Sequence, residues 1–149
     1  MNRLAARAFH LYAWAARGLT GGARVVVTDG SRVLLVRHTY VGGLHLPGGG
    51  VEVGETFAEA AVKELREEAA IAPTAPLELF GLYLNERVTR RDHVAVFVCR
   101  SWERGAFEPG REIAEAAFHP RDALPGDVTE PTRRRIAEVL EGRSPDPRW

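Results

Sequence analysis

The stretch that most constrains this chain runs from Leu46 to Ile71, where a glycine-rich segment leads directly into a short helical pattern. Three consecutive glycines, at positions 48–50, allow sharp turns and a close approach of the backbone to a ligand. Thr56 and Glu59 match a Thr-x-x-Glu capping box, which predicts a helix that begins at Phe57 and extends to Ile71. The sequence therefore predicts a tight turn followed at once by a helix.

This helix carries an unusual cluster of charge. Its apolar stripe recurs at helical spacing and consists of Phe57, Ala61 and Leu65. Glu64, Glu67 and Glu68 stand at i, i+3 and i+4, so three carboxylates project from one face. Like charges at this spacing destabilise an isolated helix by roughly 0.2–0.5 kcal/mol per pair. Either Lys63 and Arg66 relieve a solvated face, or a hard divalent cation such as Mg²⁺ binds these oxygens.

The same residues carry a family resemblance. Gly49, five residues, Glu55, seven residues and then Lys63–Ile71 resemble the Nudix box, Gly-x5-Glu-x7-Arg-Glu-U-x-Glu-Glu-x-Gly-U, where U is a bulky apolar residue. Lys63 stands where the box has arginine, and it lacks the planar fork that binds carboxylates bidentately. Ala70 stands where the box has glycine, and alanine resists the positive φ of a helix-ending glycine.

The resemblance implies a Mg²⁺ site, in which Mn²⁺ can substitute. The box positions that correspond to metal ligands of the family are the Gly48 carbonyl, Glu64, Glu67 and Glu68. Glu64 and Glu67 are the candidate catalytic residues, with Glu64 as candidate general base. Because some family members use a base outside the box, Glu112 and Glu115 are candidates for an outside carboxylate, and Glu115 is included among the metal ligands.

Three further box residues have supporting roles in this interpretation, namely Gly49, Glu55 and Lys63. Glu55 is expected to position Lys63 and the loop. The sequence identifies no substrate-binding residue. Arg87, Arg90 and Arg91 form a basic cluster that is either a solvated hairpin tip or a contact for substrate phosphates.

The implied reaction is Mg²⁺-dependent hydrolysis of a nucleoside diphosphate linked to another moiety. Nucleotide sugars, nucleoside triphosphates and the 5′ end of RNA all remain open as substrates. A different class of function, a catalytically weak Nudix-fold module that binds nucleotides or regulates, is suggested by Lys63 and Ala70. Twenty basic and twenty acidic residues give a net charge of zero, so we expect a small-molecule partner rather than a stable nucleic-acid partner.

The N-terminal region differs from the rest. Residues 1–22 interleave Arg3, Arg7 and Arg17 with apolar side chains, and no acid precedes Asp29. This pattern predicts a basic amphipathic helix. It can pack on the domain or on a second subunit of a homodimer, or it can adsorb to an anionic membrane surface.

We expect one Nudix-like domain over residues 23–142 and a flexible tail over residues 143–149. A chain of 149 residues is long enough to bury a core. The single Cys99 cannot form an internal disulfide, and no apolar run approaches the roughly 20 residues that span a bilayer. The sequence therefore favours a soluble, cytoplasmic protein.

The remaining pattern is a series of short strands and a last helix. Asp29-Gly30-Ser31 joins two β-branched runs and predicts a hairpin between Ala23–Asp29 and Arg32–Arg37. The other predicted elements are strands at Leu77–Leu84, His93–Arg100 and Ala116–His119, and a helix that begins at Thr129 or Glu130. Arg133–Arg135 is expected on an exposed helix face, and His38, His45 and His93 at polar edges or loops. This order predicts an α+β fold or a three-layer α/β/α sandwich; the mixed sheet follows from the resemblance alone.

Overall fold

A computed structural model describes residues 3–149 of the chain. The helices of this part are α1 (Arg3–Arg17), α2 (Phe57–Ala69) and α3 (Glu130–Glu141). Its strands are β1 (Thr20–Val27), β2 (Arg32–His38), β3 (Leu44–His45), β4 (Gly48–Gly50), β5 (Ile71–Pro73), β6 (Glu78–Leu84), β7 (Asp92–Cys99), β8 (Trp102–Arg104) and β9 (Ile113–Pro120). The predicted box helix is present, but it ends at Ala69, and Ile71 begins β5 instead. The strand pair β6–β7 and the last helix are present as well.

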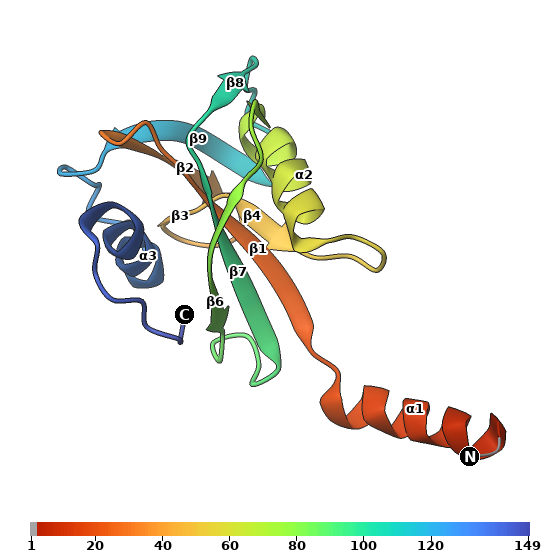
Figure 1. Ribbon diagram of the computed structural model, residues 1–149. Helices are drawn as coiled ribbons and strands as arrows, with labels where there is room; N and C mark the ends of the chain where they lie inside the picture. Colours follow the sequence, from red (N-terminus) through yellow and green to blue (C-terminus); the bar gives the residue numbers. More distant parts are fainter. Residues whose placement is uncertain (1–2) are drawn as a thin grey trace.

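The strands form a mixed arrangement in three sheets. The largest has the order β4-β1-β7-β6, in which β1 runs parallel to β7 while the other neighbours are antiparallel. A second sheet has the order β3-β2-β9, and β5 pairs with β8. Helices α2 and α3 lie on opposite sides of these strands (Figure 1). The expected sandwich with a mixed sheet is therefore confirmed.

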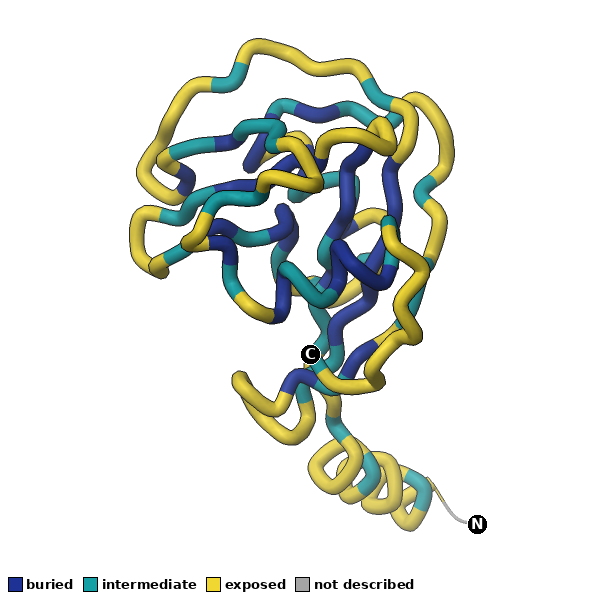
Figure 2. Tube along the Cα trace, turned by 90° about the vertical axis from the view of Figure 1, so that its left-hand side faces the viewer, coloured by how far each residue is buried: buried dark blue, intermediate teal, exposed yellow. Residues whose placement is uncertain are grey.

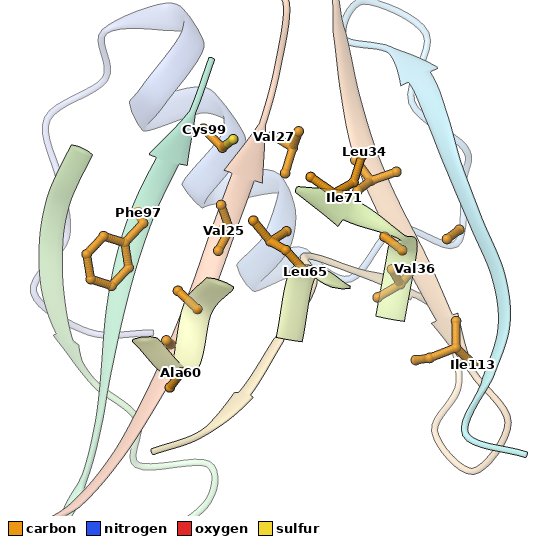
Figure 3. Close-up of a cluster of buried hydrophobic side chains, with 14 of the residues drawn as sticks. Val25, Val27, Leu34, Val36, Ala60, Leu65, Ile71, Phe97, Cys99 and Ile113 are labelled. Atoms are coloured by element: carbon orange, nitrogen blue, oxygen red, sulfur yellow. The ribbon is translucent and has the colours of Figure 1, made fainter. Parts of the chain in front are cut away.

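The central strands bury side chains on both faces, and this creates two cores. On one face, Val25 and Val27 of β1 pack with Leu65 of α2 (Figure 3). On the other face, Val26 of the same strand belongs to a cluster that includes Ile136 of α3. Successive residues of a strand point to opposite faces, so one continuous apolar run serves both helices. The glycine turn and α2 are thereby fixed against the same strand.

The hairpin prediction for the first two strands is wrong. β1 and β2 belong to different sheets and share only an isolated bridge between Thr28 and Val33. Both strands are apolar on both faces, so each is the centre of its own sheet and pairs there with strands distant in sequence. The turn signal at Asp29-Gly30-Ser31 correctly marked a reversal of the chain, but not the pairing across it.

Helix α1 projects away from the rest of the molecule (Figure 1; Figure 2). None of residues 3–17 is buried, and Arg91 Nη1 donates a hydrogen bond to the Ala15 carbonyl at 3.0 Å. The helix is therefore not packed on its own domain, which was one of the expected arrangements. β1 begins at Thr20, so residues 20–22 are strand rather than helix, and residues 1–2 of the predicted helix lie outside the described residues. Within residues 3–149, no helix is both long enough and apolar enough to cross a membrane.

The C-terminal residues, expected to be flexible, are held against the domain. Arg135, expected on an exposed face, is 0% exposed and donates from Nη1 to the Arg148 carbonyl at 3.0 Å. Its Nη2 lies 2.7 Å from Glu138 Oε1, which also accepts the backbone N–H of Asp146 at 3.0 Å. A buried ion pair therefore fixes the backbone of the tail, and residue spacing alone gave no sign of it.

Candidate active site

The glycine turn, one face of α2 and the polar end of β1 enclose a cleft of about 410 Å³. Its walls come from strands β1, β2, β3 and β4, from α2, and from the loops that precede β3 and β9. The residues that line it are Arg24, His38, Tyr40, Val41, His45, Gly48, Gly49, Gly50, Glu64, Glu68 and Glu112. Three carboxylates from two separate parts of the chain therefore meet in one cavity.

Glu68 is the most buried of these carboxylates, with 8% of its surface exposed. Its Oε2 accepts the backbone N–H of Gly48 at 2.8 Å, and its Oε1 lies 4.0 Å from His38 Nε2. Burial, helped by the charges of Glu64 and Glu112, raises the pKa of Glu68 to about 7 against the opposing effects of the Gly48 hydrogen bond and Arg24. A carboxylate with so little compensation favours the approach of a cation.

The glycine turn allows this close packing. Gly48 has φ +147°, and a Cβ there would collide with the backbone of Ala23 on β1. The Gly48 carbonyl accepts a hydrogen bond from Arg24 Nη1. At Gly49, a Cβ would lie 2.6 Å from the carboxyl carbon of Glu64. Gly48 therefore requires glycine because the backbone of β1 lies so close, whereas a side chain at Gly49 would displace the Glu64 carboxylate.

Glu64 and Glu67 are neighbours at different depths. Glu64 lines the cleft, and its pKa is raised first by burial and then by the charge of Glu67. Glu67 is exposed and lines a different groove of about 780 Å³ on the outer face of α2, together with Lys63 and Pro76. The three helix carboxylates therefore differ in exposure: Glu68 is buried, Glu64 is intermediate and Glu67 is exposed.

The two carboxylates proposed from outside the box have different surroundings. Glu112 lines the cleft, and its charge raises the pKa of both Glu64 and Glu68. Glu115 does not line the cleft, and its Oε2 lies 3.3 Å from Arg37 Nε in an ion pair. The structure therefore brings Glu112 rather than Glu115 to the other carboxylates.

The supporting residues of the box meet beside the helix. Lys63 Nζ donates to both oxygens of Glu55, at 2.8 and 3.1 Å, and lies 3.5 Å from Glu52 Oε1. The hydrogen bond to Glu55 is the main cause that raises the pKa of Lys63. The capping box of α2 is formed, with Thr56 Oγ1 accepting the Glu59 N–H at 3.2 Å. The loop is thus joined to its helix at both the cap and this ion pair.

Sequence reasoning missed several residues of the cleft. Arg24 is the single charged residue of β1, and this isolated charge in an otherwise uncharged strand was the available signal. His38 and His45 were expected only as polar edge or loop residues, yet both line the cleft. Their ring centroids are 5.5 Å apart, and burial lowers the pKa of His38. Neutral imidazole is therefore favoured beside Glu68.

The donors in the cleft fit a hard cation in chemistry, although the described side chains are not gathered around one point. Carboxylate oxygens of Glu64, Glu68 and Glu112 and the Gly48 carbonyl are ligands of the type that Mg²⁺ prefers. Among residues 3–149, no three carboxylate, imidazole or thiol groups stand at coordinating distances. Coordination of one ion therefore requires side-chain rotation, and it would relieve the repulsion that raises the pKa values of Glu64 and Glu68.

The fold and the cleft together define a class of protein, an α/β/α sandwich with a glycine turn and a row of helix carboxylates at one site. The sequence profile of the NUDIX domain matches residues 18–140. The chain therefore belongs to the Nudix family. The matched region begins just before β1, so α1 lies outside it.

Individual relatives agree with this assignment. An ADP-ribose pyrophosphatase of Methanocaldococcus jannaschii is 31% identical over 67% of this chain, and the match spans only 61% of that relative's length. A MutT-like protein of Streptomyces ambofaciens is 30% identical over 83% of this chain and 77% of its own length. The crystal structure of a MutT NUDIX hydrolase from Burkholderia pseudomallei, 22% identical, has a TM-score of 0.69 and covers 80% of this chain and 97% of that one. This last likeness concerns the fold alone.

Proposed function

We propose that this protein is a Mg²⁺-dependent hydrolase that cleaves the pyrophosphate linkage of a nucleoside diphosphate joined to another moiety. The observation that carries the proposal is the meeting of Glu64, Glu68 and Glu112 in one cleft beside a glycine turn. Three acids in one partly buried cavity repel each other unless a cation joins them. A nucleotide pyrophosphate would bind through the remaining coordination positions of such a cation, which screens the phosphate charge from the carboxylates.

The residues would divide the work by position. Glu64, Glu68, Glu112 and the Gly48 carbonyl would hold the metal, and the exposed Glu67 would join them by rotation of its side chain. Mg²⁺ would supply charge screening and polarisation of the phosphate oxygens. Arg24, between the turn and the cavity, is placed to contact a phosphate oxygen. Lys63 and Glu55 keep the loop against α2, so that the carbonyl and the carboxylates stay in register.

The chemical step needs a proton acceptor, and Glu64 is the best placed. It lines the cleft, and burial raises its pKa, so it accepts a proton more readily than an exposed glutamate. The oxygen of a water molecule attacks one phosphorus, the P–O bond of the anhydride breaks, and the leaving phosphate oxygen takes the bonding electrons. The proton of the attacking water passes to the Glu64 carboxylate. The products are a nucleotide and a phosphorylated fragment.

A substrate screen with the full chain tests the proposal. The compounds are ADP-ribose, suggested by the name of the M. jannaschii relative, together with nucleotide sugars and nucleoside triphosphates, each with Mg²⁺ and with EDTA. We expect Mg²⁺-dependent cleavage of at least one class, and a loss in kcat of about 10²-fold or more for Glu64→Gln, Glu67→Gln and Glu68→Gln. Glu103→Gln on β8, outside the cleft, is the matched control with unchanged kcat.

Two results would oppose the proposal. Cleavage that persists undiminished in EDTA would exclude the metal, and unchanged kcat in all three glutamine variants would exclude the site. Nucleotide binding by calorimetry without turnover of any compound would favour the binding module that Lys63 and Ala70 suggest.

A further inference from the structure

A second cavity, of about 300 Å³, adjoins the carboxylate cleft. Arg24, Val41 and His45 line both cavities, so one ligand can extend from one into the other. The second cavity has apolar walls at Val88 and Trp149, and no aspartate or glutamate among residues 3–149 lines it. The two cavities therefore differ in chemistry, with a metal-attracting acidic end and a neutral to basic, partly apolar end.

The second cavity contains an acceptor without a donor. Asn85 lines it, and only 8% of this residue is exposed. Asn85 Nδ2 donates to Asp92 Oδ2 at 2.9 Å, and because a carboxylate only accepts, this contact fixes which end of the amide faces Asp92. Asn85 Oδ1 is then left buried with no hydrogen-bond partner among residues 3–149. Buried polar atoms are nearly always paired, so this oxygen is available to accept a hydrogen bond from a ligand N–H in the cavity.

An aromatic side chain forms another part of the wall and is held rigidly. The backbone N–H of Trp149 donates to the Leu84 carbonyl at 2.9 Å, which attaches the residue to the end of β6. Its ring meets Tyr83 edge to face at 6.1 Å between centroids, and Arg135 Cζ lies 5.5 Å from its centroid. Arg135 and Glu138 thus act as positioning residues for Trp149. The cavity wall is preformed rather than assembled around a ligand.

We propose that this second cavity binds the nucleobase of the substrate and favours bases that carry an exocyclic amino group. Asn85 Oδ1 accepts a hydrogen bond from that amino group, and the Trp149 side chain supplies apolar contact to the ring. Arg24 stands where the cavities join, so the phosphates extend toward the carboxylates. This inference rests on the proposed function and names its substrate class: derivatives of adenine or cytosine rather than of hypoxanthine or uracil.

Calorimetry with matched nucleotides tests the selectivity. AMP is compared with IMP, and CMP with UMP, because each pair differs by one amino group replaced by a keto oxygen. We expect the amino member of at least one pair to bind about tenfold more tightly, the effect of one buried hydrogen bond. Asn85→Ala removes this difference, whereas Thr74→Ala, which lies outside both cavities, keeps it. Equal affinity within both pairs, or no binding of any of the four, overturns the proposal.

Fluorescence provides a measurement that does not depend on altering Asn85. The chain has three tryptophans, so Trp14→Phe with Trp102→Phe leaves Trp149 as the single reporter. AMP is expected to change the Trp149 emission with saturation, and inorganic pyrophosphate, which has no base, is expected to leave it unchanged. An emission that stays constant while calorimetry detects AMP binding places the base elsewhere and overturns the proposal. If the substrate screen detects hydrolysis in that case, the proposed function stands without this subsite; if AMP binds here without any turnover, the subsite stands and the hydrolase does not.

Discussion

Helices α2 and α3 each bury one glutamate, and the two carboxylates differ in how many hydrogen-bond partners they have. Glu138 of α3, 5% exposed, accepts hydrogen bonds from Arg135, from the Asp146 backbone and from the Tyr83 hydroxyl, at 2.7, 3.0 and 2.8 Å. Glu68 of α2, 8% exposed, accepts the Gly48 N–H and has two other acids near it. A fully paired buried carboxylate has a structural role, whereas an under-paired one in a cleft is a candidate functional group.

Breaking the paired site has the largest expected effect on stability. Glu138→Ala leaves Arg135 buried with an uncompensated charge and removes the acceptor of the Tyr83 hydroxyl. We expect a loss of about 3–5 kcal/mol in the free energy of unfolding, measured with urea. The double variant Arg135→Met with Glu138→Leu is expected to recover most of this loss, because an apolar pair replaces the ions. A loss below about 1 kcal/mol in the single variant would mean that the pair is not isolated from water.

The under-paired Glu68 predicts that the stability of the protein depends on pH. The ordinary pKa of 4.5 for Glu68 is raised to about 7 by burial, so the folded state holds the proton more tightly than the unfolded state. The contribution of Glu68 to stability is therefore fully present below about pH 4.5 and is lost as the pH rises through about 7. The full loss is about 3 kcal/mol for a shift of this size. Urea unfolding in EDTA at pH 5 and pH 8 measures it.

The variant Glu68→Gln isolates this contribution from other titrating groups. In EDTA, the wild type is expected to lose stability relative to Glu68→Gln between pH 5 and pH 8. Mg²⁺ at pH 8 is expected to raise the stability of the wild type more than that of the variant, which keeps Glu64 and Glu112 but lacks the most buried carboxylate of the cleft. A constant difference between the two proteins over this pH range would show that Glu68 is ionised and compensated in the folded state.

The same contrast explains what the sequence could predict. The capping box at Thr56 and Glu59 acts over one turn of helix, so local spacing identified the start of α2 correctly. The joining of Glu112 to the helix carboxylates depends on where β9 lies beside β2, and residue spacing does not encode that pairing. Arg135 appeared solvated within an Arg-Arg-Arg run, because its partners Tyr83 and Arg148 are distant in sequence. Local patterns thus predicted the elements, and tertiary pairing decided the cleft.

The wrong hairpin prediction for β1 and β2 has the same cause, because strand pairing is not encoded locally. Val25 and Leu34 each lie in an apolar run that is buried on both faces, and such runs are compatible with several partners. The choice of β7 as the parallel neighbour of β1 is made by the whole sheet. The turn at Asp29-Gly30-Ser31 could not indicate it.

The ends of the two helices give the smallest predicted effect. Both end in the left-handed region, α2 at Ala70 with φ 54° and α3 at Gly142 with φ 69°. Alanine at this φ costs about 1–2 kcal/mol, and part of the gain from Ala70→Gly is lost to the greater freedom of glycine in the unfolded chain. We therefore expect Ala70→Gly to stabilise the protein by about 1 kcal/mol, or roughly 2–4 °C in Tm for a chain of this size.

The matched reverse change is Gly142→Ala. A Cβ at Gly142 would have no neighbour within 4 Å among the described residues, so the substitution tests backbone conformation without a steric clash. It is expected to destabilise the protein by about 1 kcal/mol, measured by the same thermal unfolding. If Ala70→Gly lowers Tm instead, packing by the Ala70 methyl must outweigh the backbone strain. The neighbour for such packing is Gly105, whose N–H donates to the Ala70 carbonyl at 2.8 Å. The difference in strain between the two helix ends could then not be explained by alanine at one cap and glycine at the other.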